Sequence, residues 1–255
     1  MADVEARTAH LSAPLAVVDL AALVRNADEL VRRAQGKPIR IATKSVRCRA
    51  ILDLVLARDG FAGLMAYSLA EAIWLVRHGA SDVLVGYPSV DAQAITELGA
   101  DEVLRAAITL TVDDPAHLQL IAGHAKAPVR ICLDLDASLR IGPLHLGVRR
   151  SGLRTADDAL ALMRQADAIG RTRVVGLMCY DAQIAGVPDT SPAVRMMKRR
   201  SLAELAKRRA AVVAAVRGAT ELEFVNAGGT GSLHAMGTQA DITEVAAGSG
   251  LFGPT

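Results

Sequence analysis

The chain has 255 residues, of which 51% are hydrophobic and 22% charged, enough apolar sequence for the core of one barrel-sized domain. A formal net charge of +2, with acids and bases interleaved, and an aromatic content of 3% argue against nucleic-acid binding. No apolar run reaches the roughly 18 residues of a membrane span. Residues 1–13 lack the order of a signal peptide. Three scattered cysteines favour reduced thiols, so we expect a cytoplasmic protein.

Apolar, β-branched runs alternate with amphipathic stretches along the chain. After a loose amino-terminal arm at 1–14, a short strand is expected at 15–18, followed by a helix that Asp19 caps and Gly36 ends. Eight further strands are expected at 39–42, 63–66, 82–86, 108–112, 129–135, 174–179, 222–226 and 242–246. Helices are expected over 48–58, 68–78, 91–98, 115–125 and 155–170, with a long basic helix after Pro192. Ser68 and Glu71 predict a capping box, and 136–154 and 181–191 are expected as loops.

Continuous apolar strands between helices indicate a parallel sheet, and eight such units close into a barrel. We therefore predict an α/β fold, a (β/α)8 TIM barrel, over residues 15–255. An open doubly wound sheet is the alternative, but its first βα turn would carry a glycine-rich phosphate motif. Here that turn carries Lys44. No covering helix follows the eighth strand, so either this side of the barrel is open or the chain is part of a longer one.

Lys44 directly follows the first barrel strand, and barrels place their catalytic groups at the carboxyl ends of strands. Glycine-rich turns at 226–232 and 248–250 follow the last two strands, where barrels commonly bind phosphate. A phosphate site facing a strand-end lysine suggests pyridoxal 5'-phosphate condensed with Lys44. On position alone Lys44 would more often be a solvated loop residue, and a phosphate-binding barrel without pyridoxal stays open as an alternative.

Other polar residues near the strand ends are less specific. Arg149 and Arg150 could pair with a carboxylate or a phenolic oxygen, or could be a solvated pair. Tyr180, at the end of the sixth strand, could face the cofactor ring or be a core residue. His145 is more often structural than catalytic at such a place, and Cys132 and Cys179 alternate with apolar strand residues as small core side chains do.

Five stretches in order resemble the alanine-racemase-like, fold-type III family of pyridoxal-phosphate enzymes. The similarity is greatest to its D-threonine aldolase and D-serine dehydratase branch, as in proteins called amino acid deaminase/aldolase. The stretches are Ala-Thr-Lys-Ser-Val-Arg at 42–47, His-Leu-Gly-Val-Arg-Arg-Ser-Gly-Leu at 145–153, and the segments 176–186, 225–232 and 243–250. Each motif is modest alone, and together they cover nearly the whole chain.

The resemblance implies roles for individual residues. Lys44 would be the lysine that bonds the cofactor, Arg150 would lie at the substrate and phenolic-oxygen side, and Tyr180 would pack against the ring. The implied cofactor-binding set is Lys44, Tyr180, Asn226, Gly228, Gly229, Thr230, Gly248 and Ser249. Where racemases carry an arginine on the pyridine nitrogen, this chain has Ala246, which weakens the racemase interpretation.

The family's carboxyl-terminal β-domain has no counterpart after the barrel in this sequence. In the aldolase and dehydratase branch that domain carries the ligands of a divalent metal, so no metal ligand is placed here. The resemblance implies a lyase that cleaves β-hydroxy D-amino acids by a retro-aldol reaction or dehydrates D-serine or D-threonine, this chain being a truncated form. A single-domain pyridoxal-phosphate-binding protein without turnover and an amino acid racemase are the alternatives. We expect a homodimer with a small-molecule substrate and neither nucleic acid nor membrane as a partner.

Overall fold

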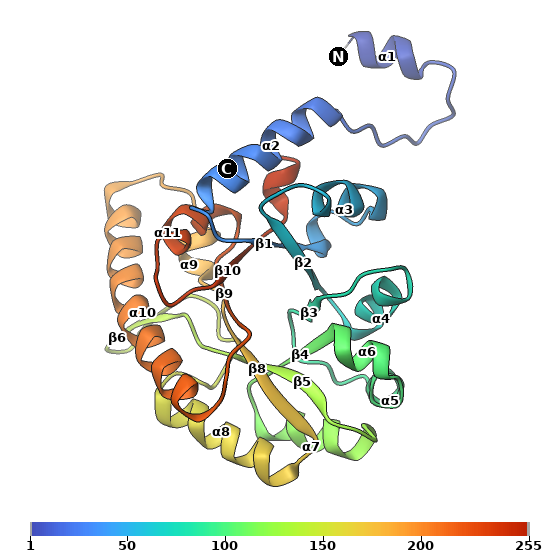
Figure 1. The fold of residues 1–255 in the computed structure, drawn as a ribbon. Helices are drawn as coiled ribbons and strands as arrows, with labels where there is room; N and C mark the ends of the chain where they lie inside the picture. Colours follow the sequence, from blue (N-terminus) through green and yellow to red (C-terminus); the bar gives the residue numbers. More distant parts are fainter. Residues whose placement is uncertain (1, 254–255) are drawn as a thin grey trace.

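The computed structural model describes residues 2–253, and in it eight parallel strands close into a barrel (Figure 1). The order around the barrel is β1-β10-β9-β8-β5-β4-β3-β2, and β1 closes it by pairing with both β10 and β2. The strands are β1 Ile39–Ala42, β2 Phe61–Ala66, β3 Val83–Val85, β4 Ile108–Val112, β5 Val129–Asp134, β8 Thr172–Cys179, β9 Phe224–Ala227 and β10 Glu244–Ala247. The predicted TIM barrel is confirmed, and the open doubly wound sheet is excluded.

Helices surround the barrel on its outside (Figure 1). They are α2 Leu20–Arg33, α3 Arg49–Leu56, α4 Leu69–Arg77, α5 Ala92–Ala100, α6 Glu102–Ala107, α7 Pro115–His124, α8 Ala156–Ile169, α10 Pro192–Ala219 and the short α11 Leu233–Gly237. The caps follow the sequence, because Asp19 accepts a hydrogen bond from the Ala22 N–H and Thr155 forms a complete capping box with Asp158. Within residues 2–253, every helix is too short or too polar to span a bilayer.

The prediction of a strand at 15–18 is wrong. This segment has no regular structure, and Leu15 and Val17 are exposed. The reason is topological, since both edges of β1 are already paired and a closed barrel has no free edge for another strand. In the preceding arm, residues 2–8 form the helix α1 (Ala2–Thr8), which stands away from the barrel (Figure 1).

Two expected loops contain regular structure. The segment 136–154 forms an antiparallel hairpin of β6 (Leu139–Ile141) and β7 (Leu144–Leu146), in which Gly142 takes a φ of +55° between the strands. A residue other than glycine is strained at such an angle. The segment 181–191 contains the short helix α9 (Ala182–Ala185). Short apolar runs of three or four residues are too brief for periodicity to reveal them.

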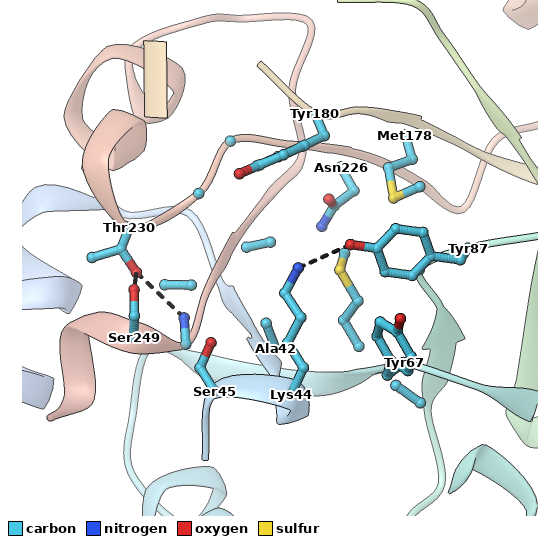
Figure 2. A pocket seen from close by; sticks show the side chains of 18 of the residues that line it. Ala42, Lys44, Ser45, Tyr67, Tyr87, Met178, Tyr180, Asn226, Thr230 and Ser249 are labelled. Atoms are coloured by element: carbon cyan, nitrogen blue, oxygen red, sulfur yellow. Dashed lines mark hydrogen bonds between the residues drawn. The ribbon is translucent and has the colours of Figure 1, made fainter. Parts of the chain in front are cut away.

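The barrel interior holds a buried charged network. Arg40 is 2% exposed and its guanidinium is bonded to Glu244 (2.7 and 2.9 Å) and Asp82 (both 2.9 Å), while it lies 5.3 Å from the centroid of the Phe224 ring. Asn226 joins this network by donating from Nδ2 to Glu244 Oε1 (2.8 Å). The network fixes the orientation of Asn226, which is one of the residues that line the pocket drawn in Figure 2.

Candidate active site

A pocket opens at the carboxyl ends of the barrel strands. All nine residues predicted for the site line it: Lys44, Arg150, Tyr180, Asn226, Gly228, Gly229, Thr230, Gly248 and Ser249. Five of them, Lys44, Tyr180, Asn226, Thr230 and Ser249, are labelled in Figure 2. Ala246, at the position where racemases were expected to carry arginine, lines it as well. The barrel topology thus brings together segments that lie about 200 residues apart in sequence.

Lys44 lies on a single 3₁₀ turn that follows β1 directly. Glu71 on α4 holds this turn, because its carboxylate accepts hydrogen bonds from the Thr43 hydroxyl (2.8 Å) and from the Tyr67 N–H (2.8 Å). The expected capping box is therefore only half formed. Ser68 accepts from the Glu71 N–H (3.2 Å), but the Glu71 carboxylate is used to support the lysine turn instead of the helix start.

The Lys44 amine is engaged by a residue that the sequence analysis missed. Nζ donates a hydrogen bond to the hydroxyl of Tyr87 (3.0 Å), which follows β3 after one glycine. The Tyr87 ring meets the ring of Tyr67 edge-on, with centroids 5.2 Å apart. Tyr67 directly follows β2, so both tyrosines occupy the strand-end positions that barrels use for function. That positional rule could have identified both.

Arg150 is held rigidly at the side of the pocket. Its Nε donates to Asp134 Oδ2 (2.6 Å) and its Nη2 donates to the Gly86 carbonyl (2.7 Å). The guanidinium carbon lies 4.8 Å from the centroid of the Tyr87 ring and 5.9 Å from that of Tyr180. Asp134, at the end of β5, is fully buried; burial raises its pKa to about 7, although Arg150 lowers it. The pocket therefore gains a fixed cation from Arg150.

The other sequence candidates lie outside the pocket lining. Arg149 is exposed, so the two neighbouring arginines have different surroundings. His145 lies on β7 of the hairpin and is partly buried. Cys132 and Cys179 are buried in strands, as expected, and burial raises the pKa of both thiols, which makes them poor nucleophiles.

The two glycine-rich turns meet on the side of the pocket opposite Tyr87 (Figure 2). Thr230 Oγ1 accepts hydrogen bonds from the N–H groups of Gly248 (3.4 Å) and Gly250 (3.2 Å) and from the Ser249 hydroxyl (3.1 Å). A Cβ on Gly248 would lie 2.6 Å from the carbonyl oxygen of Ala42, so only glycine allows this approach. Converging N–H groups and hydroxyls are the donors that phosphate oxygens prefer.

Tyr180 and Asp181, which directly follow β8, lie next to the same turns. A Cβ on Gly229 would lie 3.2 Å from Tyr180 Cε2, so the ring packs closely on the first turn. Asp181 is fully buried, and burial raises its pKa to about 7. The Ser232 hydroxyl and the Gly228 N–H are near enough to lower that pKa, but neither reaches the carboxylate in full hydrogen-bond geometry.

The pocket fits pyridoxal 5'-phosphate in its chemistry. It offers an amine that can bond an aldehyde, a ring face beside Tyr180, a fixed cation at Arg150, and N–H groups and hydroxyls for a phosphate at Thr230 and Ser249. The donors for the phosphate and the amine lie on opposite sides of one pocket, as a ligand that carries both groups requires (Figure 2).

Comparison with known proteins places this chain in a family. The model of the alanine racemase N-terminal domain matches residues 18–255. The chain belongs to the alanine racemase N-terminal domain family. In sequence it is 25% identical over 245 residues to the 3-hydroxy-D-aspartate aldolase of Paracoccus denitrificans strain Pd 1222, covering 95% of this chain and 61% of that protein.

Solved structures agree on the fold. A D-threonine aldolase from Filomicrobium marinum superposes with a TM-score of 0.79 at 24% identity, covering 95% of this chain and 63% of that one. The D-threo-3-hydroxyaspartate dehydratase from Delftia sp. HT23 superposes with a TM-score of 0.68 at 25% identity, covering 96% of this chain and 62% of that one. The chain thus spans a little over 60% of the length of these family members.

Proposed function

We propose that this chain binds pyridoxal 5'-phosphate through Lys44 and forms the cofactor-binding barrel of a lyase that acts on D-amino acids. One observation carries the cofactor part of this proposal: the Lys44 amine and the paired glycine turns line the same pocket from different sides. The relatives support the reaction class, because they include an aldolase and a dehydratase for hydroxylated D-amino acids. The low identity leaves the individual substrate as part of the proposal.

Pyridoxal phosphate supplies an aldehyde that bonds amines and a conjugated ring that takes up an electron pair released at Cα. The protein supplies the surroundings for that chemistry. The hydroxyls of Thr230 and Ser249 and the backbone of Gly248 line the pocket where the two glycine turns meet, and they are placed to bind the phosphate. Tyr180, which lines the pocket, would pack beside the ring.

Arg150 and Lys44 act near the reacting atoms in this proposal. The bonds of the Arg150 guanidinium to Asp134 and to the Gly86 carbonyl hold it in place to pair with a carboxylate or a phenolic oxygen. Lys44 would have a second role, because its amine lies in the pocket and could act as a base when it is not bonded to the cofactor. That amine can accept the proton of a β-hydroxyl group, which cleavage of the Cα–Cβ bond requires.

The substitution at position 246 favours a lyase over a racemase. Alanine at this position offers the pyridine nitrogen no cation, whereas the racemases were expected to place an arginine there. Groups beside the ring nitrogen tune how readily the ring takes up electrons, so a change there alters which reaction is favoured.

Absorbance spectroscopy tests the cofactor proposal. On addition of pyridoxal phosphate, the wild-type protein should develop a band near ~420 nm that borohydride abolishes, as a lysine-bound aldehyde does. Lys44→Ala should lose the band. Lys37→Ala is the matched control and should keep it, since Lys37 donates to the carbonyl of Ile242, outside the pocket lining.

Product analysis tests the reaction class. Aldehyde or keto-acid release from D-threonine or 3-hydroxy-D-aspartate, without release from the L-isomers, is the expected result. Capture of pyridoxal phosphate at Lys44 without turnover of any of these amino acids would favour the alternative of a pyridoxal-phosphate-binding protein. A protein that stays colourless in the presence of the cofactor would refute the proposal altogether.

A further inference from the structure

The tyrosines of this protein are gathered in one place. The chain has three, Tyr67, Tyr87 and Tyr180, and all of them line the pocket that contains Lys44 (Figure 2). Tyr87 is the tyrosine whose hydroxyl is bonded to Lys44 Nζ, at 3.0 Å. Three phenols in the pocket of one amine indicate that a phenol hydroxyl has a chemical role there in addition to the packing of its ring.

The chemistry of the lining narrows the choice of proton-transfer groups. Among the described residues that line the pocket there is no carboxylate, imidazole or thiol. Arg150 does not release its proton in proteins, and serine and threonine hydroxyls are weak acids. The side chains in the lining that commonly transfer protons are therefore Lys44 itself and the three tyrosines. Of these phenols, Tyr87 is the one in hydrogen-bond contact with the lysine nitrogen.

The Tyr87 ring is held on several sides. The Arg150 guanidinium lies 4.8 Å from its centroid and is itself fixed by Asp134 and by the carbonyl of Gly86. The edge of Tyr67 packs against it with a centroid separation of 5.2 Å. These contacts keep the hydroxyl beside Nζ, as a proton-transfer group requires.

We propose that Tyr87 is the general acid–base group that makes and breaks the bond between Lys44 and an aldehyde ligand. This inference rests on the proposed function, because pyridoxal phosphate is the aldehyde in question. It assigns a separate task to Tyr87, since the cofactor could bind to Lys44 without its help, only more slowly.

The proton movements of this reaction balance at the tyrosine oxygen. When the neutral amine attacks the aldehyde, a C–N bond forms and one amine proton moves to the carbonyl oxygen, giving a hydroxyl group. The Tyr87 O–H protonates that hydroxyl, the C–O bond breaks and water leaves. The electron pair on nitrogen forms the second C–N bond, and the remaining nitrogen proton passes to the Tyr87 oxygen, which already accepts a hydrogen bond from Nζ. Tyr87 ends in its starting form.

A catalyst changes rates without changing the equilibrium, and this property separates the proposed role from a structural one. The experiment measures the rate of pyridoxal phosphate capture by stopped-flow absorbance and its dissociation constant by equilibrium dialysis. Tyr87→Phe should slow capture about 100-fold, as loss of an acid–base group commonly does, with little change in the dissociation constant. Tyr67→Phe is the comparison variant, because it keeps the ring that packs against Tyr87 and removes only a second phenol hydroxyl of the pocket; it should slow capture far less than Tyr87→Phe does.

Tyr87→His provides a second variant with a proton-transfer group at the same position, and it should recover at least about tenfold of the lost rate. Capture by Tyr87→Phe at the wild-type rate would overturn the inference while leaving the proposed function intact. The inference would also be overturned if Tyr87→Phe lost affinity for pyridoxal phosphate in proportion to its loss of rate, or if Tyr67→Phe slowed capture as much as Tyr87→Phe does. If the wild-type protein captures no pyridoxal phosphate at Lys44, the proposed function and this inference fail together.

Discussion

Asp181 is a fully buried carboxyl group behind the glycine turns, and its replacement by asparagine should stabilise the protein in a pH-dependent way. Burial raises the pKa of Asp181 to about 7 from the ordinary value of 3.8. The folded protein therefore holds this proton more tightly than the unfolded chain does. Because folding and proton binding are linked, Asp181 is most favourable to the folded state below pH 4, and this advantage is lost as the pH rises through 7.

The size of the effect follows from the two pKa values. Each unit of difference corresponds to roughly 1.4 kcal/mol, so the ionised carboxylate costs the folded state about 4 kcal/mol at pH 8. At pH 4.5 the same linkage gives a cost of only about 1 kcal/mol. Asparagine has nearly the same shape and carries no charge, so Asp181→Asn avoids this cost while it can still donate to neighbouring oxygens.

Urea unfolding at pH 4.5 and at pH 8 measures the difference. The free energy of unfolding of Asp181→Asn should exceed that of the wild type by clearly more at pH 8 than at pH 4.5. Asp59→Asn is the control at an exposed position and should show no such pH dependence. A stability difference that is constant across pH, or that is larger at pH 4.5, would show that Asp181 is not the destabilising buried acid described here.

The remaining predictions concern the supports of the site. Arg150→Lys keeps the charge but cannot bond both Asp134 and the Gly86 carbonyl. The free energy of unfolding in urea should therefore fall by about 1.5–3 kcal/mol. An unchanged urea midpoint would show that these two bonds do not hold Arg150 in place. Gly231→Ala places a Cβ 2.1 Å from a carbonyl oxygen of α9 and should cost about 1–3 kcal/mol. Gly218→Ala, on an open face of α10, should be neutral or stabilising by about 0.5 kcal/mol, and equal effects of the two in thermal unfolding would refute the steric argument. In Glu71→Gln the new amide N–H₂ would face one of the two groups that donate to Glu71, the Thr43 hydroxyl or the Tyr67 N–H. The free energy of unfolding should fall by about 1–2 kcal/mol, measurable as a lower urea midpoint.

Much of the fold could be predicted because its signals are local. Each barrel strand is a short, mostly apolar run, most of the surrounding helices begin at a side-chain cap, and eight repeats of this unit have few ways to close. The failures occur where the outcome depends on more than local sequence. The apolar run at 15–18 has the composition of a strand, but whether a partner strand is free depends on closure of the whole barrel.

The site was predictable in part for a similar reason. Lys44, Tyr180 and the glycine turns stand at strand ends and carry distinctive residue types, so position and chemistry both identify them. Tyr87 has the same position but was missed because its neighbours Gly86 and Pro88 suggest only a turn. The bond between Arg150 and Asp134 joins a loop to a strand, and no spacing rule predicts such a pair.

The central claim is covalent attachment of an aldehyde cofactor at Lys44, and peptide mapping tests it most directly. The protein is incubated with pyridoxal 5'-phosphate, reduced with borohydride, digested and analysed by mass spectrometry. The prediction is a single modified peptide that contains Lys44, at stoichiometric yield and with Lys37 unmodified. Modification spread over surface lysines, with Lys44 free, would contradict it.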